Sequence, residues 1–89
     1  MLRRFWFIFQ FNANEAAPGG LGYGCGVTAF DLNDALALLR SRVFKKGTIP
    51  EIRELVEDVD VSTLDPGHVL PNMGPPNLRG VWFPLGYDW

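Results

Sequence analysis

The stretch RFWFIFQF, Arg4 to Phe11, decides the fold because it is the clearest strand in the chain. Its phenylalanines at positions 5, 7, 9 and 11 fall on one face at the two-residue period of a β-strand. The other face still carries Trp6 and Ile8, so we expect a central strand that is at least partly covered on both sides. Residues 12–22 hold turn formers and adjacent glycines, which predict a hairpin loop.

A second strand is predicted directly after this loop. Two sets of residues alternate there: Tyr23, Cys25, Val27 and Ala29 on one face, and Gly24, Gly26, Thr28 and Phe30 on the other. Glycine inside a strand marks a place where another backbone or a bulky ring comes close. The glycine run has neither the Lys-Ser/Thr of a phosphate-binding loop nor the spacing of a dinucleotide fingerprint, so we interpret it as loop and strand glycines.

A helix over residues 32–46 follows. Asp31 is positioned to cap its first turn, and Asp34 lies three residues on, as in a variant of the capping box. An apolar stripe supports the assignment and consists of Leu32, Ala35, Leu36, Leu39 and Val43. Basic residues gather at the end of the segment, and Gly47 can supply a left-handed C-terminal cap.

Residues 48–61 fit either a helix or a strand, and we favour a strand at 52–58 because a second helix would leave the phenylalanine strand with few partners. Four prolines make residues 62–77 irregular, and a loop this long in a small domain is either packed or functional. Arg79–Phe83 predicts a last short strand. The expected fold is α+β: a small, mainly antiparallel sheet in the order strand, strand, helix, strand, strand, with the helix on the phenylalanine face.

The composition limits the classes of function. A chain of 89 residues forms one domain, residues 1–89, and its 47% hydrophobic content predicts that it folds. The net charge of −2 argues against nucleic acid as a partner, and no window approaches a membrane span, so we expect a cytoplasmic protein. One cysteine and one histidine cannot build a structural zinc site, and we predict no metal and no cofactor.

Charged and aromatic residues suggest a surface that binds a protein. Between Glu51 and Asp65 the chain carries six acids and a single base, Arg53, and such a surface steers a basic partner. The acids are Glu51, Glu54, Glu57, Asp58, Asp60 and Asp65. Aromatic residues near the C-terminus exceed what one helix can cover, and exposed Trp and Arg dominate binding hot spots. The residues we select for partner binding are Trp6, Asp58, Asp60, Asp65, Arg79 and Trp82. A solvated acidic face and a core closed by tryptophans are the alternative interpretations.

Two other functions remain open. Cys25, His68 and Asn72 could line a pocket under the proline-rich loop, where a thiol and a histidine would serve a small enzyme or a ligand-binding protein. A structural homo-oligomer, such as a homodimer, would bury the surplus aromatics across a symmetric interface. An isolated cysteine is more often a small buried hydrophobe than a nucleophile, so we predict that the protein is not an enzyme.

Two segments carry a resemblance. DVDVSTLDPGHVLPNMGPPNLRGVWFP (Asp58 to Pro84) and CGVTAFDLNDALALL (Cys25 to Leu39) resemble a group of small, uncharacterised single-domain bacterial proteins. The chain is also similar in general character to immunity proteins that neutralise toxins. These resemblances imply that the loop over 60–79 is a binding element. They favour a non-enzymatic protein-binding module of immunity or regulatory type, with a basic toxin or effector as its partner.

Overall fold

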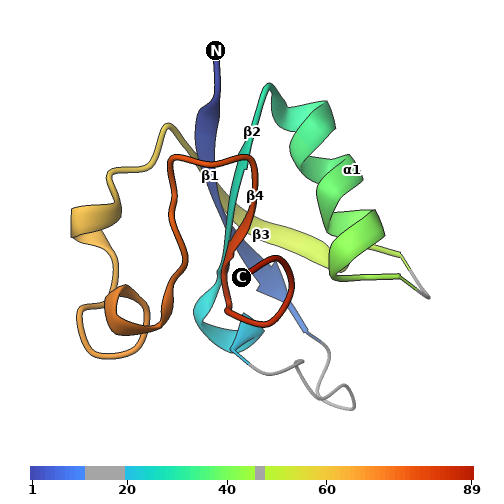
Figure 1. Cartoon of the computed structure of the whole chain (residues 1–89). Helices are drawn as coiled ribbons and strands as arrows, with labels where there is room; N and C mark the ends of the chain where they lie inside the picture. The colour runs from blue at the N-terminus through green and yellow to red at the C-terminus, as the bar shows by residue number, and fades with distance from the viewer. Residues whose placement is uncertain (12–19, 46–47) are drawn as a thin grey trace.

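Four strands and one α-helix form the fold in the predicted order. The computed structural model describes residues 1–11, 20–45 and 48–89 (Figure 1). Its elements are β1 (Arg3–Gln10), β2 (Cys25–Ala29), α1 (Leu32–Arg42), β3 (Glu51–Glu57) and β4 (Gly80–Phe83), with three single 3₁₀ turns, η1 (Leu21–Tyr23), η2 (Val61–Thr63) and η3 (Leu70–Asn72). The predicted α+β class is confirmed, and residues 48–61 contain a strand rather than a helix.

The sheet has the order β3-β1-β2-β4, and every neighbouring pair is antiparallel. β1 is therefore central, as its two apolar faces predicted. Figure 1 shows α1 on one side of the sheet and the long β3–β4 connection on the other. The predicted hairpin loop falls largely on residues 12–19, which lie outside the described residues, but its strands β1 and β2 are antiparallel neighbours.

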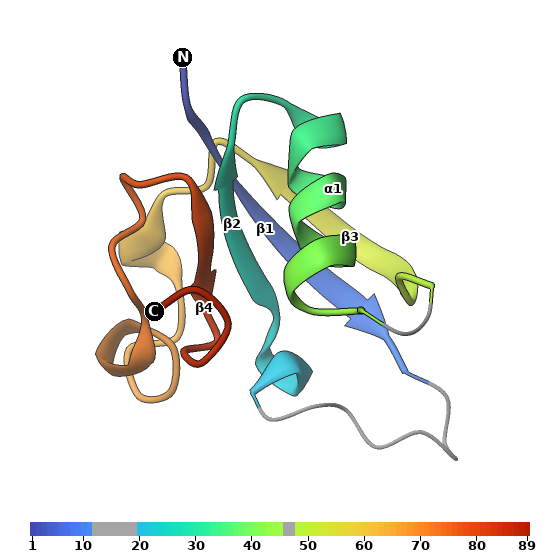
Figure 2. The same ribbon diagram turned by 45° about the vertical axis from the view of Figure 1, so that its right-hand side comes forward.

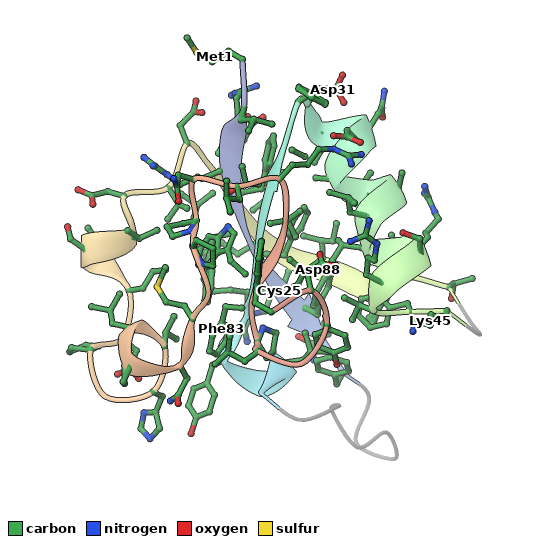
Figure 3. All side chains as sticks on the ribbon, viewed as in Figure 1. Met1, Cys25, Asp31, Lys45, Phe83 and Asp88 are labelled. Carbon is green, nitrogen blue, oxygen red and sulfur yellow. The ribbon has the colours of Figure 1, made fainter. Side chains whose placement is uncertain are left out.

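The helix begins where its cap predicts and ends early. Asp31 lies just before the helix (Figure 3), and the backbone N–H of Asp34 donates to its carboxylate at 2.7 Å. This bond satisfies a first-turn amide that has no partner within the helix. α1 ends at Arg42 rather than at residue 46, because the N–H groups of Val43 and Phe44 both donate to the carbonyl of Leu39 and close the last turn. The end of the predicted helix and its proposed Gly47 cap lie at residues 46–47, outside the described residues.

The helix-side core is built on the phenylalanine face of β1. Phe7 and Phe9 stack at 5.9 Å between ring centroids, and Phe44 meets Phe9 edge-on at 5.3 Å. The helix adds Leu38 to this core, a residue outside the predicted stripe. The buried members are Phe5, Phe7, Phe9, Leu21, Cys25, Val27, Ala29, Ala35, Leu38, Leu39 and Val81.

A second core fills the opposite face, between the sheet and the β3–β4 connection. It contains Trp6, Val59, Val69, Trp82 and Phe83. Trp82 is the extra residue of a bulge, since Gly26 pairs with Phe83 and Val27 pairs with Val81. The proline-rich loop is thus a packed layer of the protein and closes the face that carries both tryptophans.

Candidate functional site

The two tryptophans selected as partner anchors are core residues. Trp6 is 5% exposed and Trp82 is fully buried, and their rings stack at 5.9 Å. A Cβ atom added to Gly24 would lie 2.4 Å from the Trp6 ring, and one added to Gly26 would lie 2.4 Å from the Trp82 ring. The strand glycines therefore make room for bulky rings, as predicted, but the expectation that these tryptophans are exposed for a partner is wrong: the loop covers them.

The three aspartates selected for partner binding all have intramolecular partners. Asp58 accepts two hydrogen bonds from Arg3, at 3.1 and 2.9 Å, and this contact lowers the pKa of the carboxyl. Asp60 accepts from both the hydroxyl and the N–H of Ser62, which lowers its pKa. Asp65 accepts from the backbone of Gly67 at 2.8 Å, with the same effect. These carboxylates remain solvent-accessible, but each one shapes a turn or holds a chain end.

Arg79, the selected basic anchor, binds within the chain as well. Its Nε donates to Asp34 at 2.9 Å, and its guanidinium lies over the Phe30 ring, 5.6 Å from the centroid. The Arg79 hydrogen bonds, together with one from the Phe30 N–H, lower the pKa of Asp34 from 3.8 to about 2. This pair joins the start of α1 to the start of β4, so its first role is to hold the helix against the sheet.

The alternative pocket is assembled in part. A hollow of about 300 Å³ is lined by Gly20, Tyr23, His68, Asn72, Phe83, Pro84 and Leu85. His68 and Asn72 thus come together, and the Asn72 amide donates to the His68 carbonyl at 2.9 Å. Tyr23 stacks on His68 at 4.6 Å between centroids, while Asp65 lies 3.1 Å from His68 Nδ1 and orients the ring.

The third residue of that pocket, Cys25, lies elsewhere. It is fully buried in the helix-side core, opposite Phe7 of β1, and it does not line the hollow (Figure 3). Burial raises the pKa of its thiol, which opposes formation of the nucleophilic thiolate. His68 and Cys25 therefore do not form a nucleophile and base pair, whereas the hollow itself presents aromatic and amide groups to a ligand.

Strand β3 is the most exposed regular element of the described chain. Six of its seven residues are exposed, and only Leu55 is half-buried, against the helix-side core. Its apolar residues Ile52 and Val56 each retain 36% of their surface. The exposure follows from the position of β3 at the end of the sheet (Figure 2), together with the packing of α1 mainly against β2 and β4.

Two glutamates of β3, Glu51 and Glu54, are left without an ion-pair partner in the part of the chain that the structure describes. Within the described ranges, Glu51 and Glu54 make no ion pair and no side-chain hydrogen bond, and Glu57 lies 3.7 Å from Arg3. The many acids between Glu51 and Asp65 had predicted an acidic surface in this segment. However, the choice among the six acids depended on which ones find partners in the fold, and Arg3 and Ser62 are two of those partners.

The comparisons with known proteins add no relative. No family model, no curated protein and no solved structure matches the chain. Among the described residues, the one α-helix, α1, has 11 residues and is too short to span a bilayer.

Proposed function

We propose that this protein is a non-enzymatic protein-binding module of immunity or regulatory type, and that it binds a basic protein partner through β3. The observation that supports this best is the state of the β3 surface. Its two faces are exposed, and Glu51 and Glu54 have no ion-pair partner among the described residues. The charged residues that the sequence suggested for partner binding, Asp58, Asp60, Asp65 and Arg79, already bind other groups of the chain. We therefore assign the partner surface to β3.

The charge of β3 favours a basic partner. The strand carries three glutamates and one arginine. Ile52 shares the face of Phe9, and Val56 shares the opposite face of Trp6 with Glu54, so each face combines an exposed apolar group with a glutamate. Exposed charges of one sign raise the rate of association with an oppositely charged surface and make that rate sensitive to salt. Small apolar areas beside such charges add affinity once the partner excludes water. The expected interface therefore combines acidic and apolar groups along the exposed strand.

Two matched variants test the proposal. E51Q/E54Q removes two charges from β3, whereas D60N/D65N removes the same number from the β3–β4 connection; asparagine still caps turns there. The immobilised full chain is used to capture protein from an extract of its host at low salt. A partner that binds the wild type and D60N/D65N equally, and E51Q/E54Q about three- to tenfold more weakly, supports the proposal. Equal loss in both variants, or in neither, would overturn it.

The hollow beside His68 supports a second candidate, a small-ligand binder. Two of the three residues selected from the sequence line it, and the stacked rings of Tyr23 and His68 form an aromatic wall. Tyr23→Ala removes one of these two rings, and Tyr23 is half exposed. Ligand screening by NMR supports this function if small aromatic compounds shift the resonances of residues 68–72 in the wild type and not in Tyr23→Ala.

A further inference from the structure

The two edge strands of the sheet differ in whether their outer backbone groups are hydrogen-bonded, and those of β4 are. The N–H of Val81 donates to the Asp88 carboxylate at 2.6 Å, and the carbonyl of Trp82 accepts from the N–H of Gly74 at 2.7 Å. The C-terminal segment and the β3–β4 connection therefore occupy the outer backbone groups of β4. Figures 1 and 3 show the C-terminal turn, with Asp88, beside this strand. No further strand can pair there without displacing them.

The β3 edge is open by contrast. β3 pairs with β1 alone, and no other described backbone group bonds to residues 51–57. An edge strand points roughly half of its N–H and C=O groups away from its neighbour. With seven residues, β3 offers an unpaired edge of about 23 Å, a length that suits recognition of an extended peptide. Figure 2 shows β3 at the end of the sheet farthest from β4.

We propose that β3 is a strand-addition site, at which an extended, basic segment of the protein partner continues the sheet. The inference rests on the proposed function and specifies how the partner binds. Main-chain hydrogen bonds along the open edge would provide the affinity, and the β3 side chains would select the sequence. Glu54 and Val56 pair with Ile8 and Trp6 and so share their face, while Leu55 shares the face of Phe7. The complementary segment carries Lys or Arg opposite Glu54 and an apolar residue opposite Leu55.

A bulge in β3 limits the registers in which a partner strand can pair with it. Ile8 pairs with Glu54 and Phe9 pairs with Ile52, which leaves Arg53 as the extra residue of β3. A bulge and charged side chains are devices by which edge strands avoid unspecific pairing. The regular part, Glu54 to Glu57, is therefore the expected region of closest pairing.

Charge favours a different protein over a second copy of this chain. Pairing β3 with β3 would bring two strands with an excess of glutamate side by side, and like charges opposite each other destabilise a sheet. A basic strand removes this repulsion and adds attraction. The occupant is thus expected to be an arginine- or lysine-rich strand of another protein, and self-association is an outcome that the test can detect.

The test uses the isotope-labelled full chain and a capped seven-residue peptide of alternating lysine and valine at millimolar concentration. Two control peptides are compared: one with glutamate in place of lysine, and one with N-methylated valines, which lack half of the main-chain donors. The basic peptide should slow exchange of the β3 amides that do not bond to β1 by roughly tenfold, equivalent to occupancy of the edge for about nine-tenths of the time. Both controls should leave exchange at the rate of the free protein.

The outcomes separate this inference from the proposed function. Equal protection by the N-methylated peptide, or protection of no β3 amide, overturns strand addition, even where E51Q/E54Q weakens capture of the partner. Protection of β3 that grows with protein concentration in the absence of peptide overturns the basic partner in favour of a second copy. Protection by the basic peptide that is lost in E51Q/E54Q and kept in D60N/D65N supports the inference.

Discussion

Gly26→Ala should be among the most destabilising single-methyl additions in this protein. Gly26 lies in β2 under the indole of Trp82, and a Cβ atom there would lie 2.4 Å from two ring carbons, well below van der Waals contact. The ring has little room to move. Trp6 stacks on it at 5.9 Å, and Trp82 Nε1 donates to the Thr28 hydroxyl at 3.1 Å in a fully buried position.

The magnitude follows from what the ring must give up. Forcing an extra methyl into a packed core costs about 1 to 3 kcal/mol. Displacing the indole by the roughly 1 Å needed to restore contact also strains or breaks the hydrogen bond to Thr28, which contributes about 1 kcal/mol. We therefore expect a loss of about 2 to 4 kcal/mol in the free energy of unfolding, or at least roughly 10 °C in Tm for a domain of this size.

Urea unfolding measures this loss, and the chain provides its own control. Gly22 has no atom within 4 Å of its added Cβ, so Gly22→Ala should stay within about 0.5 kcal/mol of the wild type. In a Trp82→Phe background the clashing ring atoms are absent, and the cost of Gly26→Ala should fall by at least about 1 kcal/mol. Wild-type stability in Gly26→Ala, or an undiminished cost in the Trp82→Phe background, would refute the packing argument.

Three other predictions follow from single contacts. Because the folded pKa of Asp34 is lowered to about 2, its contribution to stability is present above pH 4 and is lost as pH falls toward 2. Asp34→Asn should therefore reduce the change in the free energy of unfolding between pH 4 and pH 2. The same change in both proteins would contradict the prediction. Cys25 should react with a thiol reagent on the order of a thousandfold more slowly in the native protein than in urea, and comparable rates would contradict its burial. Asp88→Ala removes the acceptor of the Val81 N–H and the ion-pair partner of Arg42, so it should lower the free energy of unfolding in urea by about 1 to 3 kcal/mol. It should also increase light scattering, because the β4 edge becomes open to pairing with other molecules. Unchanged stability would contradict the role of Asp88 in closing that edge.

Local patterns in the sequence predicted most of the fold. The alternation in Arg4–Phe11, the Asp31 cap and the short final strand depend on neighbouring residues, and all three lie in the elements predicted for them. The strand predicted at 52–58 occupies 51–57, because Asp58 takes a left-handed backbone angle, φ 54°, and turns the chain away from the sheet. Aspartate tolerates that angle better than most residues, so the sequence alone could have indicated that the strand ends before Asp58.

The candidate site was harder to predict because exposure depends on long-range contacts. Trp6 and Trp82 are 76 positions apart, and their stacking needs both Gly26 and a loop that folds back over the sheet. Arg3 and Asp58 are likewise joined only in the folded chain. The turn chemistry of Asp65 is different, since Asp-Pro-Gly is a local turn signal that predicts use of the carboxylate within the chain. This signal predicts that Asp65 serves its own turn, which leaves the glutamates of β3 as the better candidates for a partner.

Hydrogen exchange on the complex with the captured partner shows where the partner binds. The amides of the full chain are compared with and without the partner, in the β3 segment and around the hollow beside His68. If the partner binds β3, exchange slows within residues 51–57 and is unchanged in residues 20–23 and 68–72. Slower exchange around the hollow, with residues 51–57 unchanged, would contradict binding at β3.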